Sequence, residues 1–222
     1  MPEYSTVLKL IKSKSVLIFD FDGVLVDSVE VKTRAFAELY SRYGDEVIRM
    51  VVEHHRANGG MSRFDKFKYY HSSFLNKEIT EKGIAVLSER FSQLVREKVV
   101  NASAIPGAIE FIQQWCRDDR QCIINSATPE EEIRNIVLRR GWEAYFSKVY
   151  GSPDSKSVNL KYFLKTQKID ASECVFFGDA KADLAAANSC GVDFVGVGAA
   201  IAGLVSNEAE IPLLADFSCL VV

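Results

Sequence analysis

The sequence predicts an α/β protein built on a doubly wound parallel sheet, with a helical domain inserted after the first strand. Short apolar runs rich in Val, Ile and Phe alternate with amphipathic segments, a pattern typical of a parallel sheet flanked by helices. Between residues 29 and 103 this alternation stops and only helical periodicity remains. With 222 residues, 48% of them hydrophobic, the chain can bury a core in both parts.

Five short apolar runs predict the strands of the sheet. They are rich in β-branched and aromatic residues and are bounded by polar or turn-forming residues. The predicted strands are 15–20, 122–125, 149–151, 174–177 and 194–197. The end of the chain, 219–222, is predicted either to add a last short strand or to pack on the surface.

Helix start and stop signals lie between these runs. Pro106 precedes a predicted helix at 108–116, and Pro129 opens another at 130–140, which Gly141 ends. Further helices are predicted at 157–167 and 180–190, and Gly191 ends the second of these. Each helix therefore connects two predicted strands, as parallel pairing requires.

The interruption of the strand and helix alternation predicts the inserted domain. Two sets of mostly apolar residues fall at helical spacing, at positions 33, 36, 37 and 40 and at 84, 87, 91, 94, 95 and 98. Asn58, Gly59 and Gly60 form the clearest turn within this stretch. We expect an α/β core made of residues 1–28 and 104–222, and a helical domain made of residues 29–103.

Composition and charge exclude several classes of partner. The net charge of −3 gives no broad positive field, so we expect no nucleic-acid partner. No apolar stretch approaches the roughly 20 residues needed to span a bilayer, so we expect no membrane partner. The five cysteines form no CxxC pair and the N-terminus lacks a signal-peptide apolar core, which predicts reduced thiols in a cytoplasmic protein. The oligomeric state does not follow from these patterns.

Chemically active side chains follow the predicted strands. Asp20 and Asp22 follow the first strand, Ser126 follows the second, Lys156 follows the third, and 178–183 follow the fourth with two more aspartates. Ligands of parallel sheets gather at the carboxyl ends of the strands, where helix N-termini also point their positive ends. We therefore expect these carboxylates, this hydroxyl and this lysine to meet at one edge.

This set of groups suits Mg²⁺ and a phosphoryl group. Asp20 and Asp179 can supply oxygen ligands to Mg²⁺, which relieves the repulsion between their carboxylates. A carboxylate can attack phosphorus, while Asp22 protonates the leaving oxygen and later deprotonates water. Ser126 and neighbouring backbone N–H groups, including that of Ala127, would hold phosphate oxygens. Lys156 would offset their charge.

Four motifs give the chain a specific resemblance. The pattern DxDGxLxDS at 20–28, a strand-terminal Ser126, Lys156 before a helix, and GDxxxD at 178–183 resemble the signature motifs of the haloacid dehalogenase-like hydrolases. The chain is most similar to the phosphoglycolate phosphatase and β-phosphoglucomutase-like branch, whose members carry a helical cap domain after the first motif. The resemblance implies a Rossmann-like core and a cap at 29–103.

The resemblance also implies a role for each motif residue. Asp20 would be the nucleophile that forms an aspartyl-phosphate, and Asp22 the general acid and base. Asp20, the backbone carbonyl of Asp22, and Asp179 would hold Mg²⁺. Asp183 would orient metal-bound water or Lys156. The implied activity is hydrolysis of a small phosphorylated metabolite.

Several alternatives remain open at this point. Lys161, five residues beyond Lys156, is an alternative phosphate lysine because 151–156 lacks the prolines that often surround this motif. Arg63, in a glycine-containing cap segment at 59–63, would hold a second anionic group of the substrate, or it belongs to an ordinary helix turn. A sugar-phosphate mutase and a catalytically idle binding protein on the same fold are the alternative functions.

Overall fold

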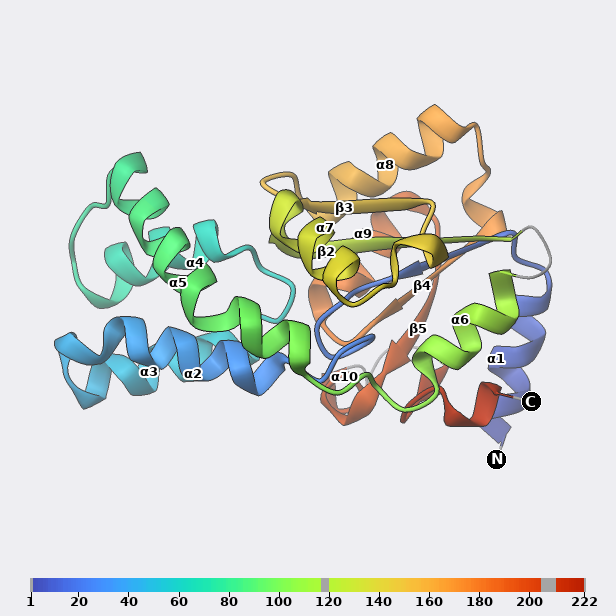
Figure 1. Cartoon of the computed structure of the whole chain (residues 1–222), viewed down its shortest axis with the longest axis horizontal. Helices are drawn as coiled ribbons and strands as arrows, with labels where there is room; N and C mark the ends of the chain where they lie inside the picture. Colours follow the sequence, from blue (N-terminus) through green and yellow to red (C-terminus); the bar gives the residue numbers. More distant parts are fainter. Residues whose placement is uncertain (1, 117–119, 205–210, 222) are drawn as a thin grey trace.

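The computed structural model describes residues 2–116, 120–204 and 211–221, and it contains a six-stranded sheet with an attached helical region (Figure 1). The strand order is β3-β2-β1-β4-β5-β6, and every neighbouring pair is parallel. The strands are β1 (Val16–Phe19), β2 (Gln121–Pro129), β3 (Lys148–Ser152), β4 (Cys174–Gly178), β5 (Asp193–Val197) and β6 (Leu213–Leu214). The predicted parallel α/β fold is confirmed.

The central position of β1 explains why its sequence is uniformly apolar. All four of its residues are buried, because helices cover both faces of the sheet. On one face, Leu17 and Phe19 pack with α1 (Pro2–Lys12), α6 (Ala108–Trp115) and α7 (Glu130–Arg139). On the other face, Val16 and Ile18 pack with α8 (Lys156–Gln167), α9 (Lys181–Cys190) and part of α10 (Gly198–Leu204). The alternation along the strand thus divides the core into two layers.

The register of the sheet aligns the strand ends that carry the motifs. Phe19, the last residue of β1, pairs with Ile124 of β2 and with Phe177 of β4. The next residues along these three segments therefore emerge at the same edge. This alignment places Asp20 between the segments that carry Ser126 and Asp179.

The two ends of the chain differ from the predictions. A strand at 219–222 is wrong for the described residues, because 218–220 form a short 3₁₀ helix and the sixth strand is β6. The physical reason is the burial of Phe217 and Leu220 against the sheet, where the ring of Phe217 lies 5.5 Å from that of Phe177. Helix α1 was not predicted. Val222 lies outside the described residues.

The helical region follows β1 and its short loop. Its helices are α2 (Val29–Tyr40), α3 (Asp45–Ala57), α4 (Arg63–Tyr69) and α5 (Glu81–Asn101), and a π-helical turn at Tyr70–Phe74 extends α4. Buried aromatic rings, including Phe36, Phe67 and Phe91, form its interior. The domain bounds 29–103 stay a prediction.

The helical region is joined to the sheet by two adjacent segments. Val26 and Ala104 form an antiparallel bridge, and the Ile105 N–H donates to the Leu25 carbonyl at 3.0 Å. The chain therefore leaves the sheet core and returns to it through two neighbouring segments. The rest of the helical region lies beside the sheet edge that carries the motifs. Within the described ranges, no helix has the length and apolarity that a membrane crossing needs.

Candidate active site

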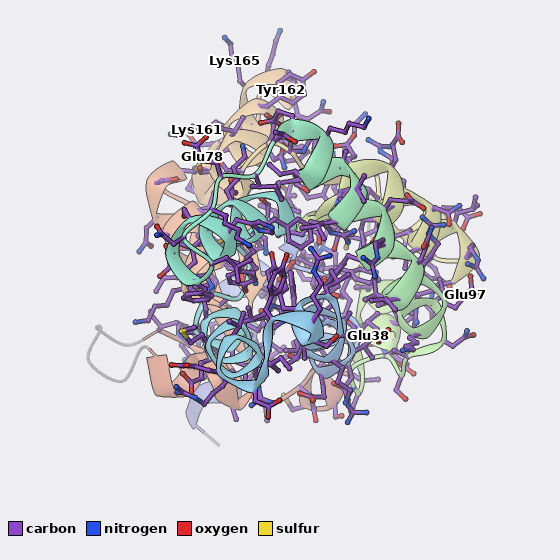
Figure 2. The ribbon with its side chains drawn as sticks, turned by 90° about the vertical axis from the view of Figure 1, so that its left-hand side faces the viewer. Glu38, Glu78, Glu97, Lys161, Tyr162 and Lys165 are labelled. Carbon is purple, nitrogen blue, oxygen red and sulfur yellow. The ribbon has the colours of Figure 1, made fainter. Side chains whose placement is uncertain are left out.

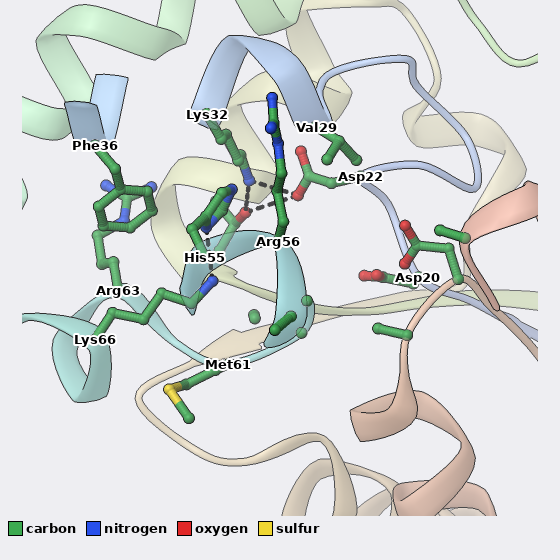
Figure 3. Close-up of a pocket in the computed structure, with 18 of the residues that line it drawn as sticks. Asp20, Asp22, Val29, Lys32, Phe36, His55, Arg56, Met61, Arg63 and Lys66 are labelled. Carbon is green, nitrogen blue, oxygen red and sulfur yellow. Dashed lines mark hydrogen bonds and ion pairs between the residues drawn. The ribbon is translucent and has the colours of Figure 1, made fainter. Parts of the chain in front are cut away.

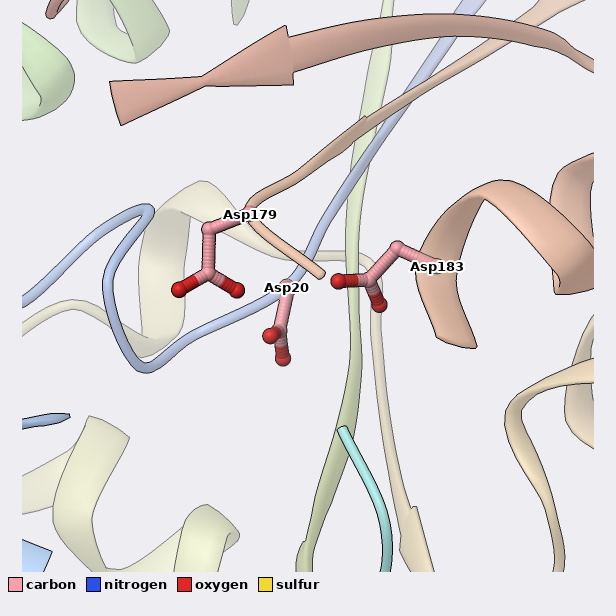
Figure 4. A group of neighbouring side chains, drawn as sticks. All are labelled: Asp20, Asp179 and Asp183. Atoms are coloured by element: carbon pink, nitrogen blue, oxygen red, sulfur yellow. The ribbon is translucent and has the colours of Figure 1, made fainter. Parts of the chain in front are cut away.

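Three carboxylates from two separate segments meet at the carboxyl edge of the sheet. Asp20 follows β1, Asp179 follows β4, and Asp183 lies in the first turn of α9 (Figure 4). One oxygen from each lies within 4.8 Å of the others. The expected meeting of residues 20 and 179 is therefore present in the structure.

Glycines in the motifs allow the carboxylates to approach one another. Gly23 has a φ of +83°, and a Cβ at this position would collide with the carboxylate of Asp179. A Cβ at Gly178 would collide with the side chain of Asp183. The glycines of the first and fourth motifs thus provide the space in which the acidic groups lie.

Lys156 brings a positive charge, its ammonium group, to this cluster of carboxylates. It begins α8, whose N-terminus is capped by Ser155, and its Nζ lies 2.8 Å from Oδ1 of Asp20. The same Nζ donates to Oδ1 of Asp183. Burial disfavours its charge, but Asp183 and Asp20 outweigh burial and raise the pKa of Lys156. Lys161 instead lies exposed on the outer face of α8, where Figure 2 labels it.

The cluster carries more negative than positive charge. Burial is the main cause that raises the pKa of Asp20 to about 7, against the opposing ammonium of Lys156. Burial, followed by the charge of Asp20, raises the pKa of Asp179 well above its usual value. A hard divalent cation among these oxygens would remove the repulsion, and carboxylate oxygens are the ligands that Mg²⁺ prefers. The residues present therefore fit Mg²⁺.

Asp22 points to different partners. The hydroxyl of Ser28 donates to Oδ1, and Lys32 and the hydroxyl of Thr128 donate to Oδ2. Burial alone would raise the pKa of Asp22, but the ammonium of Lys32 and the hydrogen bonds from Lys32 and Ser28 hold it below its ordinary value. Asp22 is thus ionised in this arrangement.

Sequence reasoning missed Lys32 and Thr128. Lys32 also donates to Oγ1 of Thr128 at 2.7 Å, so the two side chains form one network around Asp22. One signal could have indicated Lys32: a lysine in the first turn of a helix is disfavoured by the helix dipole and needs an anionic partner.

Residues at the end of β2 form another wall of the site. Ser126 is buried, and its Oγ accepts a hydrogen bond from the Thr128 N–H at 3.2 Å. Ala127 and Thr128 line the adjoining cavity. The expected phosphate-holding role of Ser126 and Ala127 stays a prediction.

A cavity of about 360 Å³ extends from the carboxylates to the helical region (Figure 3). Its volume is at the lower end of the range for small-ligand pockets, about 300–1,000 Å³. Asp20, Asp22 and Asp179 line one end, and side chains of α2, α3 and α4 line the other. Gly59 and Gly60 approach the core so closely that a Cβ on either would meet Ala180 or Ala182 at about 3 Å.

Arg63 lines this cavity, but its guanidinium is already paired. Nη2 lies 2.6 Å from Oε1 of Glu132, and Nη1 donates to Oε2 of Glu132 at 3.0 Å and to the Ser92 hydroxyl at 2.7 Å. The guanidinium also lies 4.5 Å from the centre of the Phe91 ring. The predicted binding of a second substrate anion by Arg63 stays a prediction, and it would have to compete with Glu132.

Comparisons with known proteins agree with this geometry. The sequence model of the family described as haloacid dehalogenase-like hydrolase matches residues 17–197. A phosphoglycolate phosphatase of Colwellia psychrerythraea is 25% identical over 197 residues, which cover 84% of this chain and 85% of the relative. The predicted family resemblance is confirmed.

Solved structures share the whole fold. A β-phosphoglucomutase from Clostridium difficile superposes with a TM-score of 0.75 at 20% identity, covering 93% of each chain. CbbY from Rhodobacter sphaeroides, in complex with xylulose-(1,5)bisphosphate, gives a TM-score of 0.71 at 16% identity and covers 92% of this chain and 95% of its own. At these identities the structures establish a common fold and no more.

Proposed function

The chain belongs to the haloacid dehalogenase-like hydrolases, and we propose that it is a Mg²⁺-dependent phosphatase of a small phosphorylated metabolite. The observation that carries the proposal is the meeting of Asp20, Asp179 and Lys156, because Asp20 and Asp179 line a cavity of about 360 Å³ and Lys156 contacts Asp20. A carboxylate, a cation site and an ammonium at one point are the groups that phosphoryl transfer requires. The phosphatase name of the Colwellia relative supports the same reaction class.

Asp20 is the proposed nucleophile. Its carboxylate attacks phosphorus, the bond from phosphorus to the ester oxygen breaks, and the aspartyl-phosphate forms. Water then attacks phosphorus, the bond to Asp20 breaks, and inorganic phosphate leaves. Splitting hydrolysis into two displacements makes each step easier than direct attack by water.

Asp22 is the proposed proton carrier for both steps. It gives a proton to the leaving oxygen in the first step and takes one from water in the second. The contact with Lys32 favours the ionised form, which suits the second step. Separation of Lys32 from Asp22 would remove the strongest effect that opposes burial and would shift Asp22 toward the protonated form that the first step needs.

Mg²⁺ would be held by Asp20, Asp179 and the backbone carbonyl of Asp22. When bound, it would neutralise charge on the carboxylates and on the phosphoryl oxygens. Asp183 accepts from Lys156 and from the Ala180 N–H at 3.1 Å, so its role is to orient the lysine. Lys156, Ser126 and the Ala127 backbone would hold the phosphoryl oxygens. A cytoplasmic location and the expected lack of nucleic-acid and membrane partners stay predictions.

Release of inorganic phosphate from para-nitrophenyl phosphate and from a panel of phosphorylated metabolites, with Mg²⁺ or with EDTA, tests the proposal. Asp20→Asn should lower kcat by about 10³-fold or more, as loss of a covalent nucleophile does. Asp27→Asn is the matched control, because Asp27 belongs to the same motif but is exposed. It should stay within about twofold of the parent.

The alternatives give different outcomes. Equal phosphate release by the parent and Asp20→Asn would reject the nucleophile. A mutase would interconvert phosphorylated isomers with little net phosphate release. A binding protein would release no phosphate from any compound and would form no phosphoenzyme in the first turnover.

A further inference from the structure

The amine of Lys66 lies in the wall of the cavity opposite the carboxylates. Lys66 belongs to α4 and is only 2% exposed, yet it lines the cavity. Its Nζ lies 2.8 Å from Nδ1 of His55 and 5.5 Å from the centre of the Phe36 ring. Figure 3 shows the side chain running along the cavity wall, with its nitrogen beside His55.

Lys66 differs from the other buried or largely buried cations around this cavity. Among the described residues, each of the others has a carboxylate partner, and Lys66 has the imidazole of His55 instead. The pairs are Lys32 with Asp22, Arg63 with Glu132, and Lys156 with Asp20 and Asp183. A buried ammonium without a counter-charge is costly, so the site lacks an anion that a ligand could supply.

Within the described part of the chain, the groups around Lys66 likewise provide no carboxylate in direct contact with its amine. Burial lowers the pKa of His55 to about 3, so the ring is neutral and its Nδ1 accepts a hydrogen bond from Lys66. Burial, followed by the charge of Lys32, lowers the pKa of Lys66 to about 7. The charged groups that act on Lys66 from the packed elements are Lys32, Asp22, Lys156 and Asp179, with His55 in direct contact.

We propose that Lys66, positioned by His55, binds a second anionic group of the substrate, a carboxylate or a second phosphate carried by the leaving group. This inference rests on the proposed phosphatase function and defines the class of its leaving group. An oxyanion beside Nζ completes the missing ion pair and hydrogen bonds inside a wall that is otherwise aromatic at Phe36 and Phe91. The amine thereby selects substrates that are anionic at both ends.

Three series of phosphate esters test this role. One series ends in a carboxylate, begins with 2-phosphoglycolate and grows by one methylene at a time. A second series has a neutral hydroxyl at the same position and begins with 2-hydroxyethyl phosphate. A third series of terminal bisphosphates separates recognition of a carboxylate from that of a second phosphate. The varied length tests different separations between the phosphate and the second anionic group.

The wild-type protein should favour an anionic series over the hydroxyl series by about 10- to 100-fold in kcat/KM, the range of a charge-assisted hydrogen bond. Lys66→Met should remove this preference through a higher KM, while turnover of the hydroxyl series stays within about threefold. Lys66→Arg keeps a cation and should recover part of the preference. Circular dichroism and thermal unfolding check that each variant folds.

Lys181→Met is the matched comparison, because Lys181 lines the same cavity but is exposed. It should keep the preference for the anionic series. Loss of the preference in Lys181→Met but not in Lys66→Met would overturn the inference, as would equal losses on both series in Lys66→Met. If the wild-type protein hydrolyses the esters without preferring an anionic series, only the proposed role of Lys66 is rejected. If it hydrolyses none of the esters, both the proposed function and this inference are rejected.

Discussion

Arg63 and Glu132 form a buried two-point ion pair between the helical region and the sheet core. Arg63 lies at the start of α4 and Glu132 in the first turn of α7, 69 residues further along the chain. Ser92 of α5 also donates to Glu132. Although burial opposes it, the positive charge of the Arg63 guanidinium holds the pKa of Glu132 below its usual range. The pair therefore joins α4 of the helical region to α7 of the sheet core.

Removing one member of this pair should loosen the contact between the two parts. Arg63→Met leaves a buried, unbalanced carboxylate, and breaking a buried pair in this way costs about 3–5 kcal/mol. Urea unfolding and hydrogen exchange of α4 and α5 measure the loss. The double variant Arg63→Met/Glu132→Leu should recover most of it.

The chain offers a control for this experiment. Arg139 of α7 and Glu97 of α5 also join the two parts, but through an exposed pair. Exposed pairs contribute little to stability, so Arg139→Met should unfold at nearly the same urea concentration as the parent. Equal losses in Arg63→Met and Arg139→Met would contradict the role of burial.

Lys32 should control the protonation of Asp22. In Lys32→Met, burial acts on Asp22 without the opposing ammonium, so the pKa of Asp22 rises. The limb of the profile of kcat/KM against pH that reports Asp22 then moves to higher pH. Hydrolysis of para-nitrophenyl phosphate between about pH 5 and pH 9 measures it. Arg34→Met, an exposed change on the same helix, should leave the profile in place, and an unmoved limb in Lys32→Met would disprove the link.

Gly60 should be needed for the close contact of the helical region with the core. A Cβ at Gly60 would lie 2.9 Å from the Ala182 Cβ and 3.6 Å from Nζ of Lys156. Gly60→Ala should therefore displace the cavity wall and lower kcat/KM by about 10- to 100-fold. Gly141 also has a positive φ, but a Cβ there would meet nothing within 4 Å.

Gly141→Ala is thus the control that separates backbone strain from the cavity contact. Both variants should lose about 1–2 kcal/mol of stability to the left-handed backbone, as thermal unfolding will measure. Only Gly60→Ala should lose activity. Parallel losses of activity in both variants would show that strain alone is responsible.

Binding of Mg²⁺ should weaken as the pH falls. Burial raises the pKa of Asp20 to about 7 and that of Asp179 well above its usual value, so acid adds protons that the cation must displace. Between about pH 8 and pH 6 the half-saturating Mg²⁺ concentration should rise, by up to about tenfold per pH unit for each coupled proton. The rise in melting temperature with added Mg²⁺ measures this concentration.

Asp179→Asn should remove most of the Mg²⁺-dependent rise in melting temperature. A half-saturating concentration that is the same at both pH values would contradict competition between protons and the cation. An unchanged response in Asp179→Asn would place the cation elsewhere.

The alternation of β1 to β5 with helices α6 to α9, and the edge where the acidic groups meet, were predictable from the sequence. Apolar runs, Pro129, Gly141 and Gly191 are local signals for strands and for helix ends, and parallel strands bring their carboxyl ends to one edge. For this reason Asp20 and Asp179 could be assigned to one site from the sequence alone. Helix α1 and the tail around Leu220 carried no comparable local signal.

The contacts that shape the cavity depended on tertiary packing. Arg63 was predicted either to hold a substrate anion or to belong to an ordinary helix turn, and the structure pairs it with Glu132. The partner of Lys66, His55, comes from another helix. The sequence gives the residue types, and its local patterns predict which helix, strand or loop carries each of them. The partner that each buried charge finds is decided by how α2, α3 and α4 pack against the core, because Coulombic and hydrogen-bond energies depend on distances between residues far apart in sequence.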